Sequence, residues 1–430
     1  MTPRDGEATV FPHPFDEEQS ALDMLLARGR TRATLAMLGP AFVAAIAYVD
    51  PGNFATNIQG GAQFGYLLLW VVLGANLMAM LIQYLSAKLG VVTDQNLPEL
   101  CRARYPRWVA WGLWIQAEII AMSTDIAEFI GAALGLNLIF HIALLPAGLI
   151  TGAVAFALLE LNRHGFRRYE LAITGLLGII LLGFLYEMLR IGPSADGAVH
   201  GLVPHLAGAE SVYLAVGIIG ATVMPHAIYL HSALTQGRMP VRDDGERARV
   251  LRFERMDVIV ALGIAGVINL CMLAVAAKLL HGKGLASMDT IQGAHHELGQ
   301  VVGGGAALAF AVALLASGTS SSSVGTYAGQ VVMAGFVNLR IRLLVRRAVT
   351  MAPALIVLAV GVSPTDALVL SQVVLSFGIP FALIPLVRLT ADRRVMGVHV
   401  NRRLTTVTAW VIAVVVTGMN VFLISQQFTG

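Results

Sequence analysis

The chain has 430 residues, of which 57% are hydrophobic and only 13% are charged. Soluble globular domains carry about 25% charged residues, so this composition excludes an ordinary soluble protein. The 29 basic and 26 acidic residues leave a small positive net charge. In so apolar a chain, a basic excess is typical of cytoplasmic loops, so we expect a lipid bilayer as the surroundings and no nucleic-acid partner.

The N-terminal segment differs in composition from the rest of the chain. Residues 1–32 mix acids, prolines and arginines and contain no apolar run with a cleavage site, so they do not form a secretory signal. We expect residues 1–32 to be a cytoplasmic tail and residues 33–427 to form the membrane domain. The two cysteines, Cys101 and Cys271, provide neither a disulfide framework nor a paired metal site.

Eleven apolar stretches are candidates for membrane crossing, because a helix needs roughly 20 apolar residues to span a bilayer. In chain order they are residues 35–62, 66–89, 108–134, 139–159, 171–189, 212–234, 258–280, 301–337, 348–362, 367–387 and 405–424. Long continuous runs of this kind exclude a β-barrel. The sequence therefore predicts an all-α integral membrane protein with eleven transmembrane helices.

The distribution of Lys and Arg predicts the orientation. These residues fall in the tail and in alternate loops, and only Arg190, Lys278 and Lys283 fall on the opposite side. The pattern predicts a multi-pass protein of the cell inner (plasma) membrane, with its N-terminus in the cytoplasm and its C-terminus outside.

The first span is interrupted near its middle by Asp50-Pro51-Gly52-Asn53. Proline removes a backbone donor and glycine weakens a helix, so we expect unwinding that leaves carbonyls such as that of Ala47 without partners. Irregular backbone persists at membrane depth only where it lines a cavity or a site, and an intramembrane carboxylate indicates function. The alternative is a proline kink with Asp50 as a helix cap.

The sixth span is interrupted by Met224-Pro225-His226. Pro225 is expected to free a carbonyl about one turn earlier, near Ala221. Taken alone, this break favours a simple proline kink, with Met224 filling the core and His226 buried and satisfied, because such kinks are common in membrane helices.

The two breaks together are more informative than either alone. Helices 1–5 and 6–10 then form two halves, residues 33–190 and 210–390, with breaks at corresponding positions. Matching interruptions indicate a transporter with a binding site at the midplane. An odd number of helices in each half makes the repeats inverted, and helix 11, residues 404–427, is an addition.

The side chains at the breaks limit the class of substrate. Asp50 and Asn53 offer oxygen atoms, and Ala47 and Ala221 can offer carbonyl oxygens, whereas Met224 offers a soft thioether sulfur. Sites with oxygen ligands alone suit Mg²⁺ and Ca²⁺, and an added sulfur favours Mn²⁺, Fe²⁺, Co²⁺ or Cd²⁺. An organic cation could use Asp50 but would gain little from Met224.

The third span carries Glu118, Asp125 and Glu128 on one helical face. With Asp50, these are the acids expected deep in the spans. Such residues face the bundle interior and can relay protons. The alternative is a structural set that pairs with Arg346 or Arg347.

Histidine titrates near neutral pH, so His226 is a further candidate for proton transfer. His231 lies five residues further on, roughly 140° around the helix. The two histidines are therefore not expected to share a site.

Four segments in the expected order resemble signature elements of the Nramp family of divalent-metal transporters. They are residues 47–53, residues 117–128, residues 224–234 and residues 325–336. The resemblance covers nearly the whole chain after about residue 33. The sequence departs from the family pattern at Ala227 and at residues 320–324, and neither position belongs to the ligand set.

The resemblance implies a fold like that of the bacterial leucine transporter, with inverted five-helix repeats and alternating access. It implies cotransport of Mn²⁺ or Fe²⁺ with protons. We therefore expect a proton-coupled importer that prefers Mn²⁺, also carries Fe²⁺, Cd²⁺ and Co²⁺, and uses no cofactor. The implied metal ligands are the side chains of Asp50, Asn53 and Met224, the carbonyls of Ala221 and Ala47, and Gln372 when the site is occluded. The implied proton pathway comprises Asp50, His226, Asp125, Glu128, Glu118 and Arg347.

A symporter for another substrate, an intramembrane enzyme and a channel are the alternative classes of function. A symporter of the same fold for an amino acid or an organic cation is an alternative that rests on fold analogy. An intramembrane enzyme has no support from motifs such as His-Glu-x-x-His or Gly-x-Ser-x-Gly, so no enzymatic activity is expected. A channel would need a site open to both sides at once. A monomer is expected.

Overall fold

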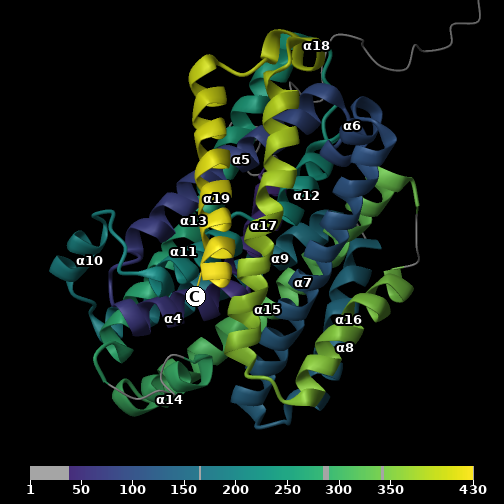
Figure 1. The fold of residues 1–430 in the computed structure, drawn as a ribbon. Coiled ribbons are helices and arrows are strands. Elements are labelled where there is room, and N and C mark those ends of the chain that lie inside the picture. The colour runs from purple at the N-terminus through teal and green to yellow at the C-terminus, as the bar shows by residue number, and fades with distance from the viewer. Residues whose placement is uncertain (1–37, 164–165, 284–289, 340–342, 430) are drawn as a thin grey trace, which may run out of the picture.

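The structure is a computed structural model that describes residues 38–163, 166–283, 290–339 and 343–429. Within these ranges the chain forms a single bundle of packed helices and contains no strand (Figure 1). The predicted all-α class is confirmed. The predicted tail, residues 1–32, lies outside the described residues.

The N-terminal half contains a broken first helix followed by four long helices. Its elements are α3 (Pro40–Ala45), η1 (Ile46–Val49), α4 (Pro51–Phe64), α5 (Leu69–Thr93), α6 (Leu97–Arg104), α7 (Arg107–Phe140), α8 (Leu144–Arg163) and α9 (Phe166–Ile191).

The C-terminal half repeats this pattern and adds one further long helix. Its elements are α10 (Ala195–Gly201), α11 (Ala209–Thr222), α12 (Pro225–Thr235), α13 (Asp244–Leu280), α14 (Ile291–Val301), α15 (Gly304–Val337), α16 (Leu343–Val360), α17 (Pro364–Ala391), α18 (Arg393–Met396), η2 (Gly397–His399) and α19 (Arg403–Thr429).

Eight helices among the described residues are long and apolar enough to cross a membrane. The first, fourth and ninth predicted spans contain the shorter apolar helices Pro40–Val49, Leu144–Val154 and Val349–Val360. Each predicted span thus corresponds to helical structure, while the number of eleven crossings stays a prediction.

Two elements differ from the sequence-based expectation. α13 begins at Asp244, well before the predicted start near residue 258, because the side chain of Asp243 caps it by accepting from the Glu246 N–H at 2.7 Å. The Ser-rich middle of the eighth span does not interrupt α15. Its hydroxyls donate to carbonyls of the preceding turn, as Ser320 does to Ala316 at 2.6 Å.

The short connecting helices support the alternation of the loops. α6 and α18 lie toward one end of the bundle and α14 lies at the opposite end, whereas α10 projects from the side (Figure 1). The sequence assigned the loops that contain α6 and α18 to the basic side and the loop that contains α14 to the opposite side. The arrangement agrees with that alternation.

Glycines allow α7 and α15 to pack closely along the centre of the bundle. A Cβ added at Gly135 of α7 would lie 2.8 Å from the Leu315 backbone nitrogen, and one at Gly318 of α15 would lie 2.6 Å from that of Ala132. Small residues that let backbones approach are typical of helix packing in membranes. α7 carries the candidate acids, and α15 carries side chains that lie behind the first break.

We predict that Gly135→Ala destabilises the protein by about 1–3 kcal/mol, because the new methyl group would push α15 away. Gly112→Ala is the matched control, since it lies in the same helix and an added Cβ would meet nothing within 4 Å. The control should be neutral or slightly stabilising, because alanine favours a helix over glycine. Thermal unfolding in detergent measures both, and equal melting temperatures would contradict the packing argument.

Candidate functional site

The first break is short. η1 ends at Val49, Asp50 is extended (φ −77°, ψ 171°), and α4 begins at Pro51. The Asp50 side chain caps α4 by accepting from the Asn53 N–H at 2.9 Å. The helix therefore unwinds over one residue after a tight 3₁₀ turn, which includes Ala47, and the capping role that the sequence offered as an alternative is present.

Side chains of other helices satisfy the carbonyls at this break. The Asn269 amide of α13 donates to the Tyr48 carbonyl at 2.8 Å, and the Ser317 hydroxyl of α15 donates to the Val49 carbonyl at 2.6 Å. Backbone polar groups at membrane depth must find such partners within the protein. Neither partner was identified from the sequence.

The second break separates α11, which ends at Thr222, from α12, which begins at Pro225. Val223 and Met224 lie between them, and both side chains are fully buried. The N-terminus of α12 has no side-chain cap. The C-terminal end of α11 presents carbonyl groups, which favour a cation.

One amide connects the two breaks. Asn53 Nδ2 donates to Asp50 Oδ1 at 2.8 Å and to the Ala221 carbonyl at 2.9 Å. The carbonyl that Pro225 was predicted to free is thus held by a side chain of the first break. Asp50 is fully buried, and its second oxygen, Oδ2, has no hydrogen-bond partner.

Gln372 of α17 lies against both breaks. A Cβ added at Gly52 would lie 2.1 Å from Gln372 Nε2, and one added at Gly220 would lie 2.0 Å from the Gln372 carbonyl oxygen. The side chain is buried, and its Oε1 atom has no hydrogen-bond partner. Both glycines are needed because any side chain would displace α17.

The donors at the breaks are chemically mixed. Among the described residues, no group of three or more His, Cys, Asp and Glu side chains could hold a metal ion. The breaks offer instead one carboxylate, amide and carbonyl oxygens, and the thioether of Met224. A set with few charges and one soft atom suits a borderline divalent ion that is bound and then released.

The acidic face of α7 separates into two environments. Glu118 pairs with Arg346 of α16, whose two terminal guanidinium nitrogens lie 3.2 and 2.8 Å from the carboxylate oxygens. This is the structural pairing with an arginine that the sequence offered as an alternative. Asp125 and Glu128 are buried deeper. A Cβ at Gly325 would lie 2.7 Å from Glu128 Oε2, so this carboxylate packs directly on α15.

The backbone of Arg347 belongs to α16, whereas its side chain lies outside the described part of the chain. Its contribution to a proton pathway therefore stays a prediction. Arg346, which the sequence offered as the other possible partner, occupies the position beside Glu118.

The two histidines of α12 have different neighbours, as expected. His226 Nδ1 lies 3.3 Å from the Thr124 hydroxyl of α7, next to Asp125, and its Nε2 has no hydrogen-bond partner. His231 Nδ1 lies 2.8 Å from Gln83 Oε1 of α5. His226 thus faces the acidic helix and His231 does not.

Acids near the ends of the predicted spans are also buried in the bundle, which the sequence did not indicate. Glu170, Glu187, Glu254 and Asp257 are also buried, with exposed fractions of 2% or less. They were dismissed because they lie near predicted span ends. The predicted spans placed Glu170, Glu254 and Asp257 just outside the membrane helices and Glu187 near the far end of the fifth span, whereas α9 and α13 carry all four into the bundle.

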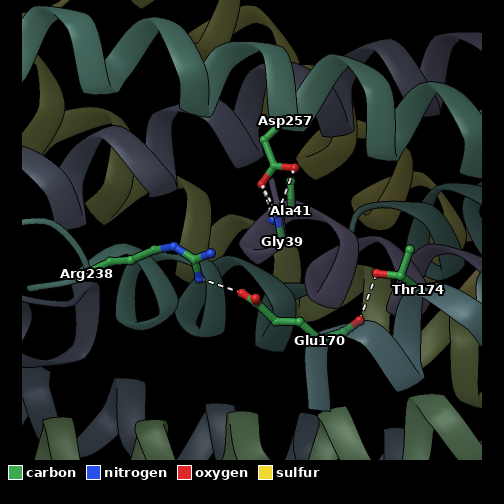
Figure 2. Close-up of polar contacts among 6 residues, drawn as sticks. All are labelled: Gly39, Ala41, Glu170, Thr174, Arg238 and Asp257. Atoms are coloured by element: carbon green, nitrogen blue, oxygen red, sulfur yellow. Dashed lines mark hydrogen bonds and ion pairs between the residues drawn. The ribbon is translucent and has the colours of Figure 1, made fainter. Parts of the chain in front are cut away.

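One of these acids, Asp257, holds the beginning of the first helix, and a second, Glu170, lies nearby (Figure 2). The Asp257 carboxylate accepts from the Ala41 N–H at 2.8 Å and from the Gly39 N–H at 3.2 Å. Glu170 pairs with Arg238, which follows α12. A Cβ at Gly39 would lie 2.4 Å from Glu170 Oε1, so these groups form one contact between α3, α9 and α13.

Two helices broken side by side within an all-helical membrane bundle define a secondary transporter. The chain also matches the family model described as natural resistance-associated macrophage protein-like, Nramp, over residues 41–426. It belongs to the Nramp family.

Proteins similar to this chain are known from several bacteria. It is 52% identical to the divalent metal cation transporter MntH of Bacillus subtilis over 411 residues, which cover 95% of this chain and 96% of that protein. It is 52% identical to MntH of Deinococcus radiodurans, over 93% of this chain and 92% of that protein.

Solved structures share the fold. A crystal structure of the Eremococcus coleocola manganese transporter aligns with a TM-score of 0.84 at 35% identity, covering 93% of this chain and 88% of that chain. A nucleobase-cation-symport-1 family transporter in a closed conformation aligns with a TM-score of 0.59 at 15% identity, covering 83% and 79%. The second likeness shows the fold alone.

We predict that Asp257→Ala loosens the start of the first helix. Losing a cap acceptor costs about 1 kcal/mol, so amide hydrogen exchange of residues 39–45 should become about fivefold faster. Asp244→Ala is the control, because Asp244 is an exposed carboxylate in the same helix that pairs with Arg247. Unchanged exchange, or an equal rise in the control, would contradict the role of Asp257.

Proposed function

We propose that this protein imports divalent transition-metal ions together with protons by alternating access, with Mn²⁺ preferred and Fe²⁺, Cd²⁺ and Co²⁺ also carried. The observation that carries the proposal is the Asn53 amide, which connects Asp50 at the first break to Ala221 at the second. Membership of the Nramp family and about 50% identity to divalent metal cation transporters support it.

In this proposal the metal ion binds between the two breaks. Asp50 supplies the negative charge through Oδ2, which has no hydrogen-bond partner. Asn53 turns its amide oxygen toward the ion and gives up its bond to Ala221, whose carbonyl then becomes a ligand. Met224 completes the side-chain set, and the Ala47 carbonyl takes part in some states.

Gln372 is proposed to bind as the site closes. It already packs against Gly52 and Gly220 and has a buried amide oxygen without a hydrogen-bond partner. A small shift of α17 would bring that oxygen to the ion, so closure and coordination would occur together.

The proton pathway is proposed to run from Asp50 along α7. His226 contacts Thr124, which precedes Asp125, and Glu128 lies one turn further along the helix. Glu118 would act at the end of this series through Arg346, and Arg347 is kept as a candidate. Acidic chains within membrane helices commonly serve as proton relays.

The remaining organisation follows from the charge pattern. We propose inverted repeats at residues 33–190 and 210–390, an extra helix at 404–427, a cytoplasmic N-terminus and an external C-terminus in the inner (plasma) membrane. We propose that a monomer is sufficient, because all proposed ligands come from one chain.

The sulfur of Met224 is proposed to discriminate against hard ions. In proteoliposomes, Met224→Ala should keep part of the Mn²⁺ uptake and gain Ca²⁺ or Mg²⁺ uptake, because hard ions lose the penalty of a soft ligand. Asp50→Ala should abolish uptake of all these ions.

Met272→Ala is the matched control for Met224→Ala. Met272 is equally buried but lies in α13. Both variants lose a similar volume and should be destabilised similarly, by about 2–5 kcal/mol. The sulfur argument fails if Ca²⁺ discrimination is unchanged in Met224→Ala, or if Met272→Ala changes it equally.

For the proton pathway, we expect Asp125→Asn and Glu128→Gln to lower proton flux more than Mn²⁺ binding. Lumen acidification during Mn²⁺ uptake measures the flux, and isothermal titration of the purified protein measures binding. Glu210→Gln, an exposed acid at the start of α11, should change neither. Equal losses of flux and binding would indicate a structural role for the two acids.

A further inference from the structure

A cavity lies between α5, α13 and the start of α19, and none of the residues of the two breaks lines it. Its volume is about 580 Å³, within the range of small-molecule sites. Lys88, Arg255 and Arg402 line it, and no Asp or Glu is among its lining residues. Three cations around one cavity without an acid favour an anionic occupant.

The three cations come from different elements and face a common point. Lys88 is 7% exposed, and its Nζ donates to Asn401 Oδ1 at 2.9 Å. Asn401 in turn bonds to Thr390 of α17 through its backbone N–H, at 3.1 Å, and its amide, at 2.8 Å. This wall of the cavity is therefore fixed, and it holds the ammonium group in place.

Arg255 and Arg402 are exposed, and both line the cavity together with Tyr84 of α5. The nearby acid Asp244 contacts His399 at 3.4 Å and is already paired with Arg247 at 2.9 Å. Its charge is thus engaged away from the two guanidinium groups, which remain available to a ligand.

The polarity of the cavity changes along the membrane normal. On α5, Leu81 precedes Lys88 by seven residues, so it lies about 10 Å deeper in the membrane. On α13 and α19, Ile259 and Leu404 follow the arginines in the same direction. Ile259 is 45% exposed and Leu404 is 78% exposed, so the apolar end opens toward the lipid.

We propose that this cavity binds an anionic phospholipid such as phosphatidylglycerol. The phosphate would lie among Lys88, Arg255 and Arg402, and an acyl chain would follow Leu81 and Ile259. Basic pockets between transmembrane helices on the cytoplasmic side bind anionic head groups. Assignment to the inner leaflet rests on the proposed orientation, whereas binding itself does not.

A lipid at this position would contact one long helix of each proposed repeat, α5 and α13, as well as the added helix α19. The phosphate alone would use only the basic end of the cavity. The apolar end, continuous with the exposed side chains of α13 and α19, is the reason to favour a lipid over a free anion.

The test uses the full chain in nanodiscs of phosphatidylcholine that contain a small fraction of spin-labelled phosphatidylglycerol or spin-labelled phosphatidylcholine. The immobilised fraction of each probe, measured without any metal ion, gives the selectivity. We expect the wild-type protein to prefer phosphatidylglycerol several-fold. Combining Arg255→Gln with Arg402→Gln should reduce this preference to near one. Each positive charge contributes at most about fivefold to the affinity for an anionic lipid, so removing two of them removes a several-fold preference.

The matched control combines Arg252→Gln with Arg403→Gln, which removes the same charge at neighbouring exposed positions outside the cavity lining. It should keep the preference, and so should Arg255→Lys combined with Arg402→Lys, which also shows that the sites tolerate substitution. An unchanged preference in the glutamine variant, or an equal loss in the control, overturns the proposal. Displacement of the lipid probe by millimolar inorganic phosphate would overturn it in favour of a free-anion site.

Discussion

Backbone polar groups at membrane depth have no water to bond with, and this constraint organises the centre of the molecule. Breaking two helices side by side frees carbonyls that must find partners. Three side chains are these partners. Asn53 donates to the Ala221 carbonyl, Asn269 donates to the Tyr48 carbonyl, and Ser317 donates to the Val49 carbonyl. Because these carbonyls already have partners, one from the other break and two from α13 and α15, the breaks can persist without a bound ion, and an entering ligand has to replace the Asn53–Ala221 bond.

The same constraint explains which parts could be predicted from the sequence. Pro51 and Pro225 remove backbone donors wherever they occur, so both breaks were located correctly. Apolar runs and the alternation of basic loops predicted helices in the right order. α13 extends further because the Asp243 cap starts it in a polar stretch that carries no continuous apolar run. The sequence also could not distinguish Arg346 from Arg347 as the partner of Glu118. Adjacent arginines of a helix point in different directions, and only the packing of α16 shows that Arg346 is the one that faces Glu118.

Partners across the bundle were the least predictable feature. Asp257 and Glu170 lie more than sixty residues apart from the groups they bind, and no local pattern relates them to Gly39 or Arg238. Their position near span ends suggested exposure to solvent. In the fold, each is instead buried beside a specific partner. As a result, the start of the first helix is hydrogen-bonded to Asp257 and lies beside the Glu170–Arg238 pair, whereas at the broken centre the Asp50 Oδ2 atom has no hydrogen-bond partner.

The mixed donor set at the breaks has a consequence for residence time. With an association rate constant of about 10⁷ M⁻¹ s⁻¹, a dissociation constant of about 1 nM implies release roughly once in 100 s, whereas about 10 μM implies roughly 100 releases per second. A compact cluster of His, Cys, Asp and Glu would hold an ion tightly enough to limit turnover. The absence of such a cluster from the described residues is therefore compatible with a site that must empty on every cycle.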